Sequence, residues 1–166
     1  EWSMSPLAQS HGAQFTRILS LGAARGDLVV SNDDIAGPID SSDEWIRQRT
    51  GIIERRRSSD AEQAIDLAVR ASLEAIEKAG IAPGQIGAVI VATISNSVQT
   101  PSLAALLADR VGATPAAAYD ISAACAGYTY GIAQADALIR SGTAEYVLVV
   151  GAEKLSDFAK PTDRSI

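Results

Sequence analysis

The chain has 166 residues, of which 47% are hydrophobic and 20% are charged, a composition typical of a globular protein with one sizeable core. Its formal net charge of -6 argues against a general phosphate-binding surface, so nucleic acid is not expected as a partner. No apolar stretch is long enough to span a membrane, and the N-terminus lacks the order of a signal peptide. A single cysteine excludes an internal disulfide, which predicts a reducing, cytoplasmic setting.

The N-terminal region divides into a tail and the first extended pieces of a fold. Residues 1–16 are polar and contain a proline, which predicts a flexible tag or tail. The run RILSLGA at 17–23 predicts a short strand that ends in glycine, and DLVV at 27–30 predicts a second extended piece.

A short helix is predicted after these strands. Ser41 is followed three positions later by Glu44, which fits a capping box, and Gly51 provides a stop. We therefore expect a helix that opens at Ser41 and ends near Gly51.

A longer helix is predicted over 62–80. Ser59 and Glu62 repeat the capping-box spacing in front of it, and Gly80 suits its C-terminal cap. One face carries apolar or small residues at helical spacing: Ile65, Ala68, Val69, Ser72, Ile76 and Ala79.

The rest of the chain alternates between strands and helices. The run AVIVAT at 88–93 is uniformly apolar and β-branched, as expected of a strand buried on both faces. Pro101 is predicted in the first turn of the next helix and Gly112 at its end. The alternation predicts a parallel sheet covered on both faces by helices. The later elements are a strand at 117–122, a helix at 126–141 and a strand at 146–153.

The only cysteine, Cys125, lies where the 117–122 strand gives way to the 126–141 helix. Asp136 and Arg140 are the only ionised residues of that helix, which predicts that the helix is buried in a core. Unpaired N–H groups and the helix dipole at its N-terminus would favour a thiolate, and a backbone N–H there could receive an oxyanion.

Position alone leaves two interpretations of Cys125 open. A free cysteine is most often a buried apolar side chain that only packs. A nucleophilic cysteine also needs a base or a cationic partner. The only histidine, His11, falls in the predicted tail, so no Cys/His pair can be assembled from this chain.

Several stretches together resemble one family, β-ketoacyl-acyl-carrier-protein synthase III. They are DSSDEWIRQRTGI at 40–52, QTPS at 99–102, DISAACAGYTYG at 120–131, VLVVGAEKLS at 147–156 and PTDR at 161–164. The resemblance begins near Ile18 and implies that residues 17–166 form the N-terminal half-domain of a thiolase-like fold. That fold is a five-layer αβαβα sandwich, of which this half would supply a mixed, mostly parallel sheet covered by helices.

The resemblance also implies a reaction. Cys125 would take the acyl group of an acyl-CoA and expel CoA. Malonyl-acyl-carrier protein would then lose carbon dioxide, and its carbanion would condense with the acyl group to initiate fatty-acid biosynthesis. Acyl-CoA is then a substrate, no cofactor or metal is expected, and the protein would act as a homodimer.

The same resemblance implies roles for five further residues. Trp45 would stack on the adenine of CoA with Ser41 nearby, and Arg49 and Arg164 would meet the CoA head group, whose phosphates suit guanidinium donors. Thr100 would reach into the acyl pocket of the dimer partner, where a small residue indicates a primer longer than acetyl. Simpler interpretations exist: Trp45 can anchor a helix, Ser41 can act only as a cap, and a lone arginine is usually solvated.

The resemblance does not cover everything that the reaction needs. The family's condensation uses a histidine and an asparagine from the second half, beyond Ile166. Ser165 stands where the family commonly has glycine. The ending KPTDRSI has no cap or closing element, so we expect the chain to be half of a longer protein. Alone it would have little condensing activity and a bare apolar face.

Three alternatives remain beside the condensing enzyme. A secondary-metabolism relative would keep the acyl-cysteine step and use another acceptor. An inactive fragment would only bind CoA or dimerise. A redox thiol would carry out no acyl chemistry.

Overall fold

The structure is a computed structural model, and it describes residues 12–160 and 162. An antiparallel ribbon is made of β1 (Leu28–Ser31) and β2 (Glu54–Arg57), and the chain between them forms α1 (Asn32–Ala36) and α2 (Asp43–Thr50). The α/β body consists of α3 (Ala64–Ala79), β3 (Ile86–Ala92), α4 (Leu103–Val111), β4 (Ala117–Ile121), α5 (Gly127–Arg140) and β5 (Tyr146–Gly151). Short 3-10 turns span Pro83–Gln85, Ala124–Ala126 and Leu155–Asp157.

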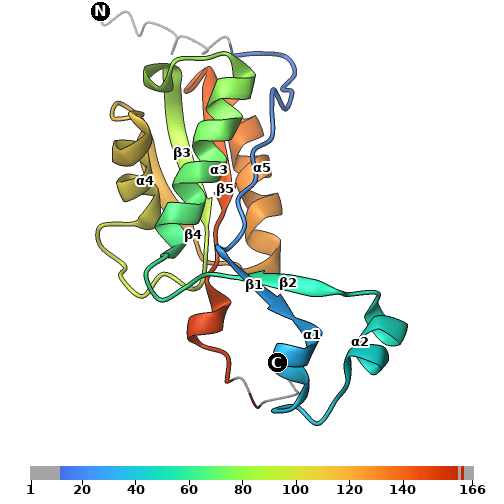
Figure 1. Cartoon of the computed structure of the whole chain (residues 1–166). Helices are drawn as coiled ribbons and strands as arrows, with labels where there is room; N and C mark the ends of the chain where they lie inside the picture. Colours follow the sequence, from blue (N-terminus) through green and yellow to red (C-terminus); the bar gives the residue numbers. More distant parts are fainter. Residues whose placement is uncertain (1–11, 161, 163–166) are drawn as a thin grey trace, which may run out of the picture.

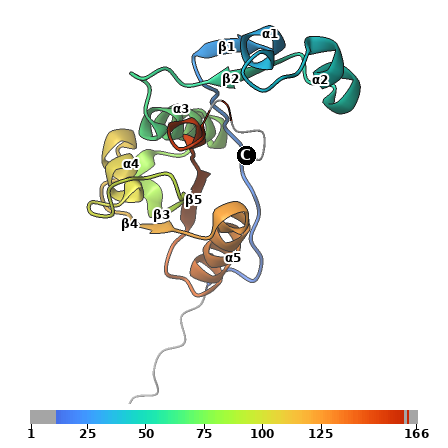
Figure 2. The same ribbon diagram turned by 90° about the horizontal axis from the view of Figure 1, so that it is seen from below.

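The sheet of the body has the strand order β4-β3-β5 and is parallel throughout. Helices α3 and α4 lie on one face and α5 on the other (Figure 2). The predicted parallel sheet with helices on both faces is therefore confirmed. Within the described residues, antiparallel pairing occurs only in the β1–β2 ribbon.

The central strand β3 forms the middle of the core. Val89, Ile90 and Val91 are completely buried. Val89 and Val91 belong to the cluster that α3 and α4 complete, whereas Ile90 faces α5, where a Cβ on Gly131 would lie 3.7 Å from it. The uniformly apolar run of β3 is thus explained by burial on both faces.

Helix α3 confirms the predicted long helix but not its predicted start. Its apolar stripe packs into the core, and Gly80 caps its end with φ 67°. Gln63 is the N-cap, and its N–H donates to Asp66 (2.9 Å). The predicted Ser59 cap is wrong because the N–H and hydroxyl of Ser59 bond instead to Asp27, next to β1.

Helix α4 also starts later than predicted. Ser102 is its N-cap and accepts the N–H of Ala105 (3.1 Å). Pro101 therefore precedes the helix and does not lie in its first turn. The predicted end at Gly112 is confirmed, with φ 81°.

The prediction that α5 is buried all round is wrong for the described chain. Its small residues Gly127, Gly131 and Ala135 are buried against β3 and β5. The exposed fractions of Tyr128 and Tyr130 are 42% and 54%, because no described element covers that face. The expected bare apolar face is therefore present. No helix within residues 12–160 combines the length and apolar character needed to cross a bilayer.

The predicted strand at 17–23 is not formed. Residues 12–27 run along α5 and α3 without joining a strand ladder, and they are tied by side chains: Ser20 donates to the carbonyl of Ala75 (2.6 Å) and Thr16 to Asp136 (2.7 Å). Since Thr16 is already bonded, ordered contacts begin before the predicted boundary at residue 17. Gly22 is required here because a Cβ would lie 2.0 Å from the carbonyl oxygen of Ala71.

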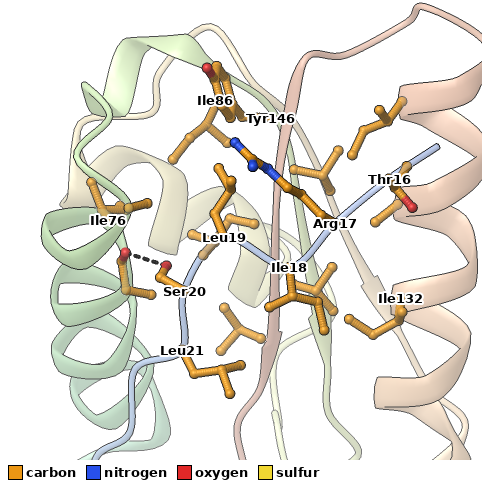
Figure 3. A pocket seen from close by; sticks show the side chains of 18 of the residues that line it. Thr16, Arg17, Ile18, Leu19, Ser20, Leu21, Ile76, Ile86, Ile132 and Tyr146 are labelled. Carbon is orange, nitrogen blue, oxygen red and sulfur yellow. Dashed lines mark hydrogen bonds between the residues drawn. The ribbon is translucent and has the colours of Figure 1, made fainter. Parts of the chain in front are cut away.

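An open cavity of about 760 Å³ separates this segment from β5. Figure 3 shows Ile18, Leu19 and Leu21 beside it, with Ile132 of α5 on the opposite wall. Residues of the 17–23 segment and of β5 line this cavity together, and the segment forms no strand ladder with β5.

The Asp66–Arg110 pair (2.9 Å) joins α3 to α4. The N–H of Gln63 and then the Arg110 guanidinium hold the pKa of Asp66 below its ordinary value of 3.8. Because a lowered pKa stabilises the folded chain above the ordinary value, this contribution is lost as the pH falls through the lowered pKa. We expect Asp66→Asn to reduce the free energy of unfolding at pH 7 by about 0.5 kcal/mol. Below the ordinary value of 3.8, the variant should lose less stability on acidification than the unchanged protein. Urea denaturation at several pH values measures both effects. Asp109→Asn on the exposed face of α4 is the control, and equal pH profiles for the two variants would contradict the assignment.

Candidate active site

Cys125 lies in the 3-10 turn between the end of β4 and the start of α5. Its residue is exposed, so the interpretation of a buried, purely packing cysteine is wrong for the described chain. Ala124 has φ 46°, a left-handed conformation that L-residues seldom adopt. The N–H of Ala126 donates to the carbonyl of Ala123 (3.1 Å). A strained, hydrogen-bonded bend thus presents the thiol at a helix start, as predicted.

The close packing behind the thiol depends on a small residue. Gly127, the first residue of α5, lies against β3, and a Cβ there would lie 3.0 Å from the Cβ of Ala92. The helix can begin directly after Cys125 because nothing larger than hydrogen occupies this point.

Asp120, at the end of β4, joins the cysteine strand to α4. Its two carboxylate oxygens accept the N–H groups of Leu103 and Ala104, both at 2.8 Å. These donors belong to the first turn of a helix, where N–H groups lack partners within the helix. Asp120 was not among the residues predicted from the sequence, although a carboxylate near the end of a strand is a recognisable signal.

Helix α2 presents Trp45 and Arg49 on one face. They are four residues apart, and the Arg49 guanidinium carbon lies 5.8 Å from the centre of the Trp45 ring, within the range of a cation–π contact. The exposed fraction of Trp45 is 48%. A half-exposed indole beside a guanidinium offers a stacking surface and a positive charge to a ligand.

The acidic residue at the start of α2 bonds to other residues of the chain. Asp43 pairs with Arg47 (2.7 Å) and accepts an amide N–H of Asn32 (2.7 Å). The bond from Arg47, followed by that from Asn32, lowers the pKa of Asp43 below its ordinary value. Arg47 is therefore committed within α2, whereas Arg49 has no carboxylate partner among the described residues.

Ser41 is not the helix cap that the sequence predicted. Ser42 is the N-cap and accepts the N–H of Trp45 (3.1 Å), and α2 ends at Gly51 as expected. The hydroxyl of Ser41 is buried and has no hydrogen-bond partner within the described part of the chain. The capping interpretation of Ser41 is wrong because its neighbour fills that role.

Asn32 fixes α2 to the β1–β2 ribbon. Its exposed fraction is 1%. Its amide donates to Asp43 and to the carbonyl of Ile52 (2.8 Å), and its oxygen accepts from Arg55 (2.9 Å). This buried hub is fully satisfied, and no local pattern in the sequence revealed it.

The candidate residues fall into two groups. The carboxyl ends of β3, β4 and β5 point toward the end of the molecule where the ribbon and α2 lie (Figure 1). Cys125 and Thr100 follow β4 and β3 at that edge, and Thr100 is exposed. Trp45 and Arg49 lie on α2, which both views place apart from α5. Arg164 lies outside the described residues.

Solved structures with the same architecture define the class. The priming β-ketosynthase from the R1128 polyketide biosynthetic pathway has a TM-score of 0.90 and 39% identity, over 96% of this chain and 48% of that protein. The 3-oxoacyl-[acyl-carrier-protein] synthase III of Aquifex aeolicus has a TM-score of 0.84 and 41% identity, over 90% of this chain and 48% of that protein. The chain is thus a half-domain of thiolase-like fold with a cysteine between strand and helix.

Sequence relatives narrow the class to a family. The β-ketoacyl-[acyl-carrier-protein] synthase III of Kocuria rhizophila is 53% identical over 98% of this chain and 46% of the relative. The family model for 3-oxoacyl-[acyl-carrier-protein (ACP)] synthase III matches residues 119–166. The chain belongs to the β-ketoacyl-[acyl-carrier-protein] synthase III family and corresponds to its N-terminal half. It spans about half the length of the curated relatives it matches.

The Asn32 hub gives a test of how α2 is held. In Asn32→Asp, the amide nitrogen that donates to Asp43 and to the carbonyl of Ile52 is replaced by a carboxylate oxygen that faces two acceptors, so we expect the free energy of unfolding to fall by at least about 2 kcal/mol. Asn96→Asp is the matched control, because the partly buried Asn96 makes a single local side-chain bond among the described residues, to the carbonyl of Val98. Urea denaturation at pH 7 measures both variants. Similar losses in the two would show that the hub is not a main support.

Proposed function

We propose that the chain supplies the acyl-accepting half of a β-ketoacyl-[acyl-carrier-protein] synthase III that initiates fatty-acid biosynthesis. The observation that carries the proposal is the exposed Cys125 at the start of α5, in a chain 53% identical to a synthase of that name. The thiolate is the form of cysteine that attacks a thioester.

The first step is thioester exchange. The Cys125 thiolate attacks the carbonyl carbon of an acyl-CoA, backbone N–H groups at the turn stabilise the tetrahedral oxyanion, and the C–S bond to CoA breaks. CoA leaves as a thiolate and takes up a proton, and the acyl group remains on Cys125. Decarboxylation of malonyl-acyl-carrier protein and condensation follow on groups beyond Ile166, so the 166 residues alone would transfer an acyl group but condense little.

The CoA site of this proposal is centred on α2. The exposed Trp45 ring would take the adenine, and Arg49 and Arg164 would pair with phosphates of the head group. The Ser41 hydroxyl, which has no partner among the described residues, would bond near the adenine. CoA is a substrate here, and the reaction calls for no resident cofactor.

In this proposal the acyl acceptor is malonyl-acyl-carrier protein. The enzyme acts as a homodimer in the cytoplasm. Thr100 would enter the acyl pocket of the second subunit. Its exposure in the β3–α4 connection is compatible with that role, and its small size favours primers longer than acetyl. The net charge of -6 supports no role for nucleic acid.

A second candidate is priming in secondary metabolism with another acyl acceptor. The likeness to the R1128 priming ketosynthase, at a TM-score of 0.90, favours it specifically. Both candidates share the acyl-Cys125 step, and supplying malonyl groups on fatty-acid or polyketide carrier proteins to the acylated protein would separate them.

Incubation with acyl-CoA tests the common step. We expect an intact-mass increase of one acyl group and release of free CoA, and Cys125→Ala should abolish both because no other thiol exists in the chain. CoA binding without an adduct would favour a non-catalytic module. A peroxide-sensitive thiol that takes no acyl group would favour redox chemistry.

Arg49→Ala tests the CoA site. Removing the unpaired guanidinium should weaken acyl-CoA binding about tenfold, the loss of one charge-assisted contact, with little change in the thermal midpoint. Arg56→Ala removes the same charge from the ribbon. Among the described residues, the Arg56 side chain bonds only to the carbonyl of Gly26 (3.4 Å), so this variant should bind CoA with unchanged affinity. Calorimetric titration measures the two affinities, and equal weakening would point to overall charge and not to a site.

A further inference from the structure

The β3–α4 loop, residues 93–102, leaves the carboxyl edge of the sheet between β4 and β5. Its first residue is built into the sheet, since the N–H of Thr93 donates to the carbonyl of Ile121 (3.1 Å). From there to Ser102, the N-cap of α4, the loop is largely exposed and carries Thr100. What holds this loop decides where Thr100 lies.

Glu153, just beyond the end of β5, holds the start of the loop by hydrogen bonds. Its two carboxylate oxygens accept the N–H of Ile94 (2.9 Å) and the N–H of Ser95 (3.0 Å). The hydroxyls of Thr93 and Ser95 also donate to it. Four donors from three consecutive loop residues thus converge on one side chain, which follows the neighbouring strand β5.

The same contact is reinforced from the β5 side. The N–H of Lys154 donates to the hydroxyl of Ser95 (3.0 Å), and the N–H of Ala152 donates to the carbonyl of Ala92 (3.2 Å). Residues 152–154 therefore continue the β3–β5 pairing by mixed main-chain and side-chain bonds beyond the regular ladder.

The far end of the loop is held in the same manner by Asp120 of β4, through the first N–H groups of α4. Both ends of the β3–α4 loop are therefore fixed by carboxylates from the two neighbouring strands. Between these anchors the described bonds are local, such as that from Asn96 to the carbonyl of Val98 (2.7 Å). Without Glu153, the N–H groups of Ile94 and Ser95 would lose their acceptor, and among the described bonds the start of the loop would keep only those of Thr93 to Ile121 and of Ser95 to Lys154.

We infer that Glu153 is a positioning residue for the β3–α4 loop and thereby sets the acyl-chain length that the enzyme accepts. The inference rests on the proposed function, which puts Thr100 in the acyl pocket. Glu153 touches neither substrate nor thiol in this scheme. It acts by holding Ile94 and Ser95, so that Thr100 meets the acyl chain at a constant depth.

The experiment compares primers in the protein as its gene encodes it, with any sequence beyond Ile166. The ratio of Cys125 acylation rates with decanoyl-CoA and acetyl-CoA is measured by intact mass, together with the affinity for free CoA and the thermal midpoint. Glu153→Ala should change the ratio about tenfold, as small displacements in a substrate pocket do, and leave CoA affinity unchanged. Glu153→Gln keeps one acceptor oxygen and should give an intermediate ratio. This variant also tests the inference if Glu153→Ala does not fold.

Glu74→Ala is the matched control. Glu74 also accepts a backbone N–H, that of Ala23 (2.8 Å), but it lies on α3 and pairs with Lys78. Its loss should leave the primer ratio unchanged.

Thr100→Phe separates this inference from the proposed function. A shift toward acetyl in Thr100→Phe with no shift in either Glu153 variant would overturn the inference and leave the proposed function intact. No shift in Thr100→Phe would remove the acyl-pocket role of Thr100, and the inference with it. A uniform fall in acylation of both primers in Glu153→Ala and Glu153→Gln would show a purely structural role and would also overturn it.

Discussion

The pairing of β3 with β4 on one side and β5 on the other is the constraint on which the rest of the structure depends. It buries Val89, Ile90 and Val91 completely, and burial of three such side chains contributes several kcal/mol of hydrophobic stabilisation. Because the three strands are parallel, their carboxyl ends meet at one edge. The turn with Cys125, the β3–α4 loop and residues 152–154 are brought together for that reason alone.

At this edge the regular backbone ladder ends, and polar side chains continue the connections. Asp120 satisfies the first N–H groups of α4, and Glu153 satisfies those of Ile94 and Ser95. A carboxylate with two acceptor oxygens can replace two strand-to-strand bonds where the strands diverge. The same solution occurs in the ribbon, where Asn32 joins the start of α2 to β2.

The elements of the body were predictable because their periodicity is strong. The apolar run of β3 and the stripe of α3 were identified from sequence, and Gly51, Gly80 and Gly112 each end a helix with a positive φ. Helix starts were less predictable. Ser41 and Ser59 fit the capping spacing, but Ser42 and Gln63 are the caps: Ser59 bonds to Asp27, distant in the sequence, and the neighbouring Ser42 takes the capping position that Ser41 was expected to fill.

Burial and long-range contacts were the properties that the sequence predicted least well. The 17–23 segment has a strand composition, yet it lies beside α3 and α5 without a ladder, because strand pairing needs a neighbouring edge within reach. Helix α5 is apolar almost all round, but described residues leave the face with Tyr128 and Tyr130 exposed. The composition of a helix indicates which side chains can be buried, but it does not indicate whether another element covers them.

The sequence by itself determined the order of the elements and the place of Cys125 between a strand and a helix, because both depend on residues close together in the chain. The alternation of strands and helices also predicted the parallel sheet, because a short helical crossover returns the chain in the same direction. The tertiary structure alone decided that the thiol is exposed and that Asn32, Asp120 and Glu153 are the anchors. Those properties depend on pairs of residues 11 to 60 positions apart, whose meeting is set by packing of the sheet and helices and not by local pattern.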